Sequence, residues 1–235
     1  MTRKSSPSDY DRYARMVRRD DYWGQVRRVV CGKAVSEEQI GMIVRKVQNL
    51  LSLNTRDCLL DLGCGNGALS ARFFDRIGDF YGVDESPYLI GIAKSDFRFE
   101  NKDCYGIGEI EKYLESEEKP ERFTKALIYA VIQHLPDEKV ISCLHLLKTR
   151  FVNIEKIVIG NIQEREKAEN VLVSLGITPS TKEIDDPDSM MGRWRTSEQI
   201  SMMAQISGWN STFSKMEEGF YASWFRYDAL LTPKA

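Results

Sequence analysis

The stretch LLDLGCGNGALS (59–70) contains three glycines, Gly63, Gly65 and Gly67, at alternate positions after an apolar run. Glycine lets a ligand approach the backbone closely and adopts dihedral angles that other residues avoid. Ligands of parallel α/β sheets bind beyond the carboxyl ends of the strands. The stretch therefore predicts a ligand-binding loop between a strand and a helix. Gly63, Gly65 and Ala68 also satisfy the GxGxxA pattern of dinucleotide-binding proteins, so the glycines alone leave the ligand open.

Acidic residues near this loop narrow the choice of ligand. Asp61 precedes the first glycine by two residues, where it would repel a pyrophosphate and attract an ammonium group. Asp84 ends the run DFYGVD about 20 residues further on, where a ribose-binding acid belongs. Asp103, in KDCYG, is expected to end a third strand and to accept from an adenine amino group. These three acids together fit S-adenosylmethionine better than NAD.

The surrounding residues predict alternating strands and helices, which indicates a parallel sheet with helices on both faces. Strands are expected at 57–62, 79–84, 97–103, 122–132 and 155–162. Helices are expected at 36–52, 66–77, 86–94, 107–117, 137–151 and near 163–175. Ser36 and Gln39 have the spacing of a capping box at the start of the first of these helices.

The rest of the chain has a different character. Residues 178–196 are rich in turn formers and acids, which predicts a loop or cap. Thr196 and Gln199 have the spacing of a second capping box, at the start of another helix. Two further strands are expected at 210–217 and 220–231.

Over about residues 36–162, these motifs resemble class I S-adenosylmethionine-dependent methyltransferases. The resemblance lies in LLDLGCGNGALS, YGVDES, ENKDCYG and ALIYAVIQHLP. It implies an α/β, Rossmann-like doubly wound sheet of seven strands, with an N-terminal helical extension, a cap or loop after the fifth strand, and antiparallel last strands. The expected organisation is a single methyltransferase domain over 1–235, with an N-terminal helical lid (1–35), a cofactor-binding core (36–162) and a C-terminal substrate-side part (163–235).

The resemblance also implies which residues hold S-adenosylmethionine. The glycine loop would line its methionine part, Asp84 and Glu85 its ribose, and Asp103 and Cys104 its adenine. The full set expected at the cofactor is Tyr22, Asp61, Gly63, Cys64, Gly65, Asn66, Gly67, Asp84, Glu85, Ser86, Asp103, Cys104, Tyr129 and Ala130. No metal is expected.

One histidine has a position suited to catalysis. A hydroxyl acceptor must lose a proton, and His134, just past the fourth strand, is expected to accept it with a pKa suited to neutral pH. The alternative is that His134 only shapes the loop. His145 falls on the apolar face of its helix and is expected to be packed or partly exposed.

Aromatic and basic residues near the chain's start and in 185–196 predict a lid over the acceptor. Trp23, Met191, Arg193 and Trp194 are the expected substrate-binding residues, and Arg193 and Arg195 would bind an anion. The alternative is that the aromatic residues anchor these segments to the sheet. The stretch FYASWFRYDALL also resembles tails of bacterial methyltransferases that act on small molecules.

Composition limits the class of partner. The 235 residues carry a net charge of −2, which gives no sign of a nucleic-acid or membrane partner. Five cysteines without CxxC spacing indicate small buried residues in a reducing compartment, and the start lacks a signal-peptide core, so a cytoplasmic protein is expected. A monomer or homodimer is also expected. The expected function is methyl transfer to a hydroxyl of a small molecule such as a sugar or secondary metabolite. N-methylation of a small amine, a non-catalytic cofactor-binding module and a nucleotide-linked dehydrogenase are the alternatives.

Overall fold

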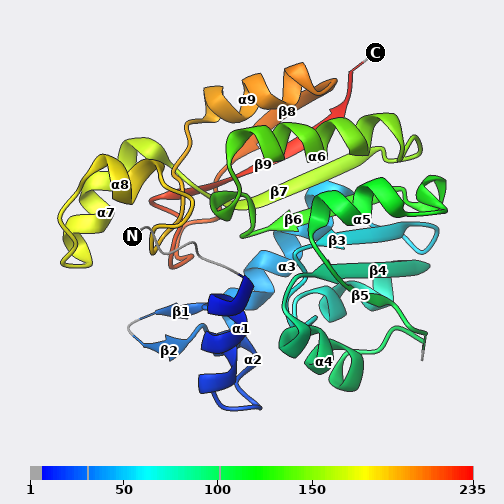
Figure 1. Cartoon of the computed structure of the whole chain (residues 1–235), viewed down its shortest axis with the longest axis horizontal. Helices are drawn as coiled ribbons and strands as arrows, with labels where there is room; N and C mark the ends of the chain where they lie inside the picture. Colours follow the sequence, from blue (N-terminus) through cyan, green and yellow to red (C-terminus); the bar gives the residue numbers. More distant parts are fainter. Residues whose placement is uncertain (1–6, 31, 101, 235) are drawn as a thin grey trace.

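A twisted sheet of seven strands forms the centre of the protein, in the order β5-β4-β3-β6-β7-β9-β8 (Figure 1). The computed structural model describes residues 7–30, 32–100 and 102–234. The strands are β3 (Cys58–Leu62), β4 (Asp79–Asp84), β5 (Tyr105–Ile107), β6 (Lys125–Tyr129), β7 (Lys156–Gln163), β8 (Trp209–Ser214) and β9 (Arg226–Pro233). The first five are parallel, and β9 runs antiparallel to both β7 and β8. The predicted fold class is confirmed.

Helices cover both faces of the sheet because its central strands are apolar on both sides. One layer contains α3 (Glu37–Leu51), the 3₁₀ helix η1 (Ser70–Arg76) and α4 (Pro87–Asp96), and the other contains α5 (Ile110–Ser116), α6 (Asp137–Thr149) and α9 (Ser197–Ile206). Neighbouring residues of a strand point to opposite faces. Leu59 accordingly packs in the first layer and Leu60 in the second, and all five residues of β3 are buried.

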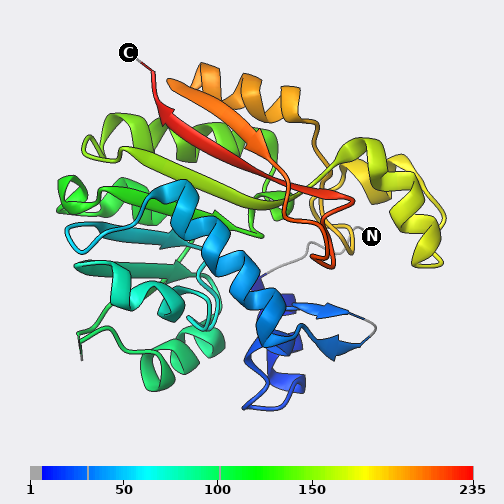
Figure 2. The ribbon, with the colours of Figure 1, turned by 180° about the vertical axis from the view of Figure 1, so that it is seen from behind.

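Two additions lie at the same end of the sheet (Figures 1 and 2). The first, called here the N-terminal cap, consists of α1 (Pro7–Met16), α2 (Tyr22–Gln25) and the hairpin of β1 (Val29–Val30) and β2 (Lys33–Ala34). The second contains η4 (Arg165–Lys167), α7 (Ala168–Ser174) and α8 (Thr181–Asp185). The remaining short 3₁₀ helices are η2 (Pro120–Arg122) and η3 (Ile132–His134).

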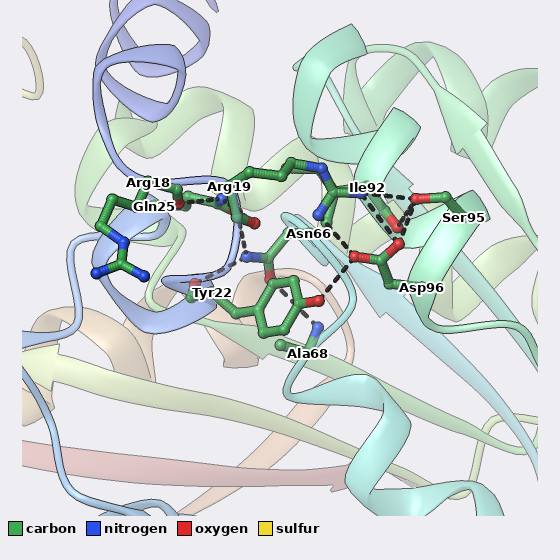
Figure 3. Close-up of polar contacts among 9 residues, drawn as sticks. All are labelled: Arg18, Arg19, Tyr22, Gln25, Asn66, Ala68, Ile92, Ser95 and Asp96. Carbon is green, nitrogen blue, oxygen red and sulfur yellow. Dashed lines mark hydrogen bonds and ion pairs between the residues drawn. The ribbon is translucent and has the colours of Figure 1, made fainter.

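Polar contacts fasten the N-terminal cap to the core (Figure 3). Asp96, at the end of α4, accepts from the Tyr22 hydroxyl at 2.8 Å and forms an ion pair with Arg19 at 2.6 Å. The Asn66 side chain, in the glycine loop, donates to the Tyr22 carbonyl and to the Gln25 amide oxygen. The cap and the glycine loop therefore hold each other in place.

Three local expectations differ from the structure. The described residues of 97–103 form no strand, and β5 begins only at Tyr105, so the prediction of a third strand ending at Asp103 is wrong. The helix expected at 66–77 is a 3₁₀ helix from Ser70 to Arg76. The capping box at Thr196 is present, but at Ser36 only half of it forms, because the Gln39 side chain instead bonds to the loop before β9.

Four cysteines, Cys58, Cys64, Cys104 and Cys143, are buried free thiols, in line with their expected packing role. Cys31 and the start of the chain, MTRKSS, lie outside the described residues. Over 7–30, 32–100 and 102–234, no helix has the length and apolar character needed to span a bilayer.

Candidate active site

The loop after β3 forms one wall of a cavity with its backbone. Gly63 and Gly65 have φ angles of 82° and 58°, a region that residues with a Cβ rarely adopt. The Gly65 N–H donates to Oδ2 of Asp84 at 2.9 Å, which ties the loop to the end of β4. A Cβ on Gly65 would lie 3.0 Å from the Val26 side chain of the N-terminal cap. The glycines therefore allow the close packing of loop, strand end and cap.

The cavity has a volume of about 730 Å³ and is bounded by the strand ends, the N-terminal cap, η3, α7 and the segment before β9. Cavities of this size are typical of small-molecule sites. The strand ends contribute Gly63, Cys64, Gly65, Asn66, Asp84, Glu85, Ser86, Tyr129, Ala130 and Asn161. The N-terminal cap contributes Tyr10, Tyr13, Val26, Arg27, Arg28, Val29 and Val30, and the segment before and into β9 contributes Tyr221, Trp224, Phe225 and Arg226. Met191 and His134 also line it.

Asp84 presents its carboxylate to the cavity at the end of β4. Its Oδ1 accepts from the Ser86 N–H and its Oδ2 from the Gly65 N–H, both at 2.9 Å. Burial raises the pKa of Asp84, and the two backbone hydrogen bonds oppose that shift. Because a carboxylate accepts about four hydrogen bonds, Asp84 retains acceptor sites for the hydroxyls of a ligand. Glu85 lines the cavity beside it.

Backbone strain is concentrated on the cavity wall at the ends of β6 and β7. Ala130, just past β6, has a φ of 62°, and Asn161, in β7, has a φ of 65°. Asn161 lies where the register between β7 and β9 shifts. Conformations of this kind cost on the order of 1–3 kcal/mol and cluster at functional sites. Their place on the cavity wall therefore supports a binding role for this cavity.

His134 lies at the end of η3 and contacts the N-terminal cap. Its Nε2 is 2.5 Å from the Tyr10 hydroxyl. The ring also bonds to the Pro187 backbone, which leaves Nε2 to accept from the Tyr10 O–H. Burial, with the nearby charges of Arg27 and Arg226, lowers the pKa of His134 to about 4. The expected pKa near neutrality is therefore wrong, and the imidazole is neutral at pH 7.

The Tyr10–His134 pair also lines a neighbouring hollow of about 290 Å³, together with Arg12, Met16 and Asp188. The hydrogen bond between the two side chains thus lies where the two hollows meet.

Arg195 holds the loop that carries His134. Its guanidinium donates to the carbonyls of Ile132 at 2.7 Å and Leu135 at 2.6 Å, and it pairs with Asp137 at 2.8 Å. Arg193 also pairs with Asp137, at 2.9 Å. Neither arginine lines the cavity, so the expectation that they bind an anion is wrong. Both arginines pair instead with the side-chain carboxylate of Asp137.

Asp61 and Gly67 lie behind the loop rather than on the cavity wall. The Asp61 carboxylate is buried and accepts from the Ser70 hydroxyl at 2.6 Å. Burial raises the pKa of Asp61 to about 6, against the opposing effects of Ser70 and the Arg28 charge. A Cβ on Gly67 would lie 2.6 Å from the Tyr105 hydroxyl, so this glycine serves internal packing.

Asp103 and Cys104 are far from their expected place at the adenine. They precede β5, whereas the ligand edge of the sheet is at the carboxyl end of that strand, after Ile107. The Asp103 side chain is 78% exposed and pairs with Lys94, and Cys104 is buried in the core. Ile110, which follows the correct end of β5, lines the cavity instead.

Three aromatic residues expected at the ligands serve packing or cap attachment. Trp194 is 0% exposed and packs near Phe225, Ala168 and Val171. Trp23 is buried and donates to Glu37 at 2.8 Å. The Tyr22 hydroxyl bonds to Asp96 on the surface of α4. None of the three lines the cavity, so the alternative that these aromatics anchor their segments holds.

Several cavity residues were not anticipated from the sequence. They are Tyr10, Arg27, Arg28, Gln133, Gln163, Trp224 and Arg226. For Trp224 and Arg226 one signal was the cluster of aromatic and basic residues in SWFRYD, which breaks the alternation expected of a half-buried strand. The anticipated residues that line the cavity are Met191, His134, Gly63, Cys64, Gly65, Asn66, Asp84, Glu85, Ser86, Tyr129 and Ala130.

The cavity fits S-adenosylmethionine in shape and chemistry. Gly63 and Gly65 line the cavity with their backbone, where the methionine part would lie, and the Asp84 carboxylate matches ribose hydroxyls. Leu89 and Ile110 supply apolar surface near the ends of β4 and β5 for a flat base.

Comparison with known proteins agrees with this geometry. Residues 59–150 match the sequence model of a methyltransferase domain. A methyltransferase from Clostridium acetobutylicum has 15% identity and a TM-score of 0.64, with 97% of this chain and 100% of that chain covered. Magnesium protoporphyrin IX methyltransferase from Synechocystis, with S-adenosylmethionine bound, has 13% identity and a TM-score of 0.58, with 98% and 93% covered.

A third structure, the small RNA methyltransferase HEN1, has 16% identity and a TM-score of 0.60, with 86% of this chain and 25% of that chain covered. At these identities the structures establish the fold. The sequence matched none of the curated proteins with which it was compared.

The fold is a Rossmann-like doubly wound sheet with an antiparallel seventh strand. The match over residues 59–150 and the shared fold together support an S-adenosylmethionine-dependent methyltransferase, and the structure from Synechocystis holds S-adenosylmethionine.

Proposed function

We propose that this enzyme transfers the methyl group of S-adenosylmethionine to a hydroxyl of a small molecule. One observation carries the proposal: a single cavity reaches from Gly65 and Asp84 to Tyr10 and Trp224. A ligand at the glycine loop and a second ligand under the N-terminal cap would therefore share one enclosed space. Its bounded volume and the chain's net charge of −2 favour a small acceptor over a nucleic acid.

Residues at the strand ends would hold the cofactor. The backbone of Gly63 and Gly65 would contact its methionine part, and Asp84 its ribose hydroxyls. Arg28 lines the cavity with its guanidinium 5.2 Å from the centre of the Tyr129 ring, a position suited to the methionine carboxylate. When bound, the cofactor supplies an activated methyl group on a sulfonium.

The chain's own contribution is alignment and the handling of one proton. Holding the acceptor hydroxyl in line with the methyl group removes most of the entropic cost of a two-molecule reaction. His134 is neutral at pH 7, and its Nε2 already accepts from a hydroxyl, that of Tyr10. An acceptor hydroxyl that replaces the Tyr10 hydroxyl at Nε2 would pass its proton to the same atom.

Two measurements on the full chain test the proposal. The first is transfer of labelled methyl from S-adenosylmethionine to hydroxylated small molecules and, in parallel, to RNA. Labelled small molecules are expected, and labelling of RNA alone would contradict the proposal. The second compares His134→Gln with His145→Gln, whose histidine is exposed on α6. A base at Nε2 predicts a loss of roughly 10²–10⁴ in turnover for His134→Gln, with His145→Gln unchanged. Equal turnover in the two variants would remove His134 from catalysis.

A further inference from the structure

The part of the cavity under the N-terminal cap combines a cationic group with aromatic walls. It is called here the acceptor half and consists of Tyr10, Met191, Tyr221, Trp224, Phe225 and Arg226. An inference about its ligand rests on the proposed function, since it concerns the molecule that receives the methyl group.

Arg226 is fixed in the wall of the acceptor half by a single hydrogen bond. Its Nη1 donates to the Asn161 carbonyl at 2.9 Å, at the residue whose φ of 65° marks the irregularity in β7. Its Nε is buried without a partner among the described residues. Its guanidinium faces the ring of Phe225, with 5.0 Å between the central carbon and the ring centre. The remaining hydrogens of Nη1 and Nη2 can donate to a carboxylate with two parallel hydrogen bonds.

No carboxylate of the described chain neutralises this guanidinium through an ion pair. Asp228, two residues further along β9, acts on Arg226 through its charge without forming an ion pair: its Oδ1 accepts from the Asn161 N–H at 2.8 Å, and its Oδ2 is buried without a hydrogen-bond partner among the described residues. The other charged and phenolic groups that act on Arg226 are Tyr10, Tyr129 and Tyr221. Burial lowers the pKa of Arg226, against the opposing effect of the Asp228 charge. An anion supplied by a ligand would add to that opposing effect.

The position of Arg226 separates it from the cofactor. It begins β9, which is three strands away from β3 in the sheet order β3-β6-β7-β9. At a strand spacing of about 4.8 Å, the distance from the glycine loop is roughly 14 Å. Arg28, in contrast, acts on Asp61 directly beneath that loop. Arg28 therefore lies nearer the glycine loop and Arg226 on the β9 side of the cavity, although both act on Tyr129.

The surroundings of Arg226 describe the rest of the acceptor. The rings of Phe225 and Trp224 are in contact, with centres 4.8 Å apart and planes tilted by 59°, and Trp224 is 47% exposed although it lines the cavity. Flat apolar walls of this kind bind aromatic rings.

We propose that the methyl acceptor is a small hydroxylated aromatic carboxylic acid, whose carboxylate is held by Arg226 and whose ring packs against Trp224 and Phe225.

The test uses the full chain loaded with S-adenosylhomocysteine and three probes: para-hydroxybenzoate, para-hydroxybenzamide and para-hydroxyphenyl phosphate. Titration calorimetry is expected to show saturable binding of the acid at about millimolar concentration or below, at least about tenfold tighter than the amide. Arg226→Gln should weaken binding of the acid by about 10- to 100-fold and leave the amide unchanged, because only the acid uses the charge. Arg226→Lys, which keeps the charge without the fork, should fall between the two.

Binding of S-adenosylhomocysteine separates the possible failures. It should be unchanged in Arg226→Gln, which also shows that this variant is folded, and weakened in the matched variant Arg28→Gln. If the wild type does not bind S-adenosylhomocysteine, the proposed function itself fails. Three outcomes with intact S-adenosylhomocysteine binding would overturn only the carboxylate assignment. The acid could bind no more tightly than the amide, its binding could fail to saturate, or the phosphate ester could bind more tightly than the acid.

Discussion

The Tyr10 hydroxyl lies 2.5 Å from Nε2 of His134, although the two residues are 124 positions apart in the chain. This hydrogen bond joins the first helix of the N-terminal cap to the loop after β6, across the acceptor half of the cavity. An acceptor that reaches Nε2 must displace the Tyr10 hydroxyl. The cap is thus part of the site as well as its cover.

The low pKa of His134 predicts a characteristic dependence of stability on pH. The folded pKa of about 4 is below the ordinary value of 6.5, so the unfolded chain binds the extra proton between these two pH values. This stability is complete above pH 6.5 and is lost as the pH falls toward 4, by roughly 3 kcal/mol. The free energy of unfolding, measured with denaturant at several pH values, should therefore fall more steeply between pH 6.5 and 4 in the wild type than in His134→Gln.

Asp61 should change the pH dependence of stability in the opposite direction and so serves as a control. Its folded pKa of about 6 is above the ordinary 3.8, so the folded chain binds the proton first and gains stability as the pH falls through 6. Relative to Asp61→Asn, the wild type should gain stability on acidification. Parallel curves for wild type and His134→Gln would show that the imidazole is not buried as described.

The two tryptophans next to Phe225 should respond differently to truncation. Trp194 is fully buried, so Trp194→Ala should lower the free energy of unfolding by about 3–5 kcal/mol. Trp224 is half-exposed on the cavity wall, so Trp224→Ala should change it by about 0.5 kcal/mol or less. Thermal and denaturant unfolding measure both. A stable Trp194→Ala with impaired acceptor binding would return Trp194 to the site.

The attachment of the N-terminal cap depends on Asn66. Its side chain donates to the Tyr22 carbonyl at 2.8 Å and to the Gln25 amide at 2.9 Å (Figure 3). Asn66→Ala leaves both acceptors unpaired, which costs about 1–3 kcal/mol and should speed chymotryptic cleavage within the cap by about 5- to 100-fold. Arg18→Ala, which removes only an exposed ion pair with Asp20, serves as the control. Equal cleavage rates in the two variants would contradict the role of Asn66.

Much of the cofactor side was predictable from the sequence because it depends on local pattern. DFYGVD is an apolar strand that ends in an acid, and Asp84 therefore lies where parallel strands bind ligands. The prediction failed at Asp103 because FRFENKD has the alternation of a strand, whereas the real strand, β5, has three residues and begins later. Register along a short strand is set by tertiary pairing with β4, which a local pattern does not contain.

The acceptor side was less predictable because its residues meet only through the fold. Tyr10 and Arg226 come from opposite ends of the chain, and Arg226 reaches the cavity because β9 pairs with β7 at an irregular register. Trp194 and Arg193 are residue types expected in a lid. In the structure, however, Trp194 packs against Phe225 and Arg193 forms an ion pair with Asp137. Residue type alone does not distinguish a group that faces a ligand from one that packs on its own chain.

Calorimetric titration with S-adenosylhomocysteine and with NAD tests the central claim, that the strand-end cavity is a methyltransferase cofactor site held by Asp84. The wild type should bind S-adenosylhomocysteine with a dissociation constant in roughly the micromolar range and should not bind NAD. Asp84→Ala, shown by circular dichroism to be folded, should weaken that binding by about 2–4 kcal/mol, since the ribose hydroxyls lose a charged acceptor. Asp103→Ala, at the exposed carboxylate paired with Lys94, should bind as the wild type does. Binding of NAD in place of S-adenosylhomocysteine, or equal affinity in Asp84→Ala and wild type, would contradict the claim.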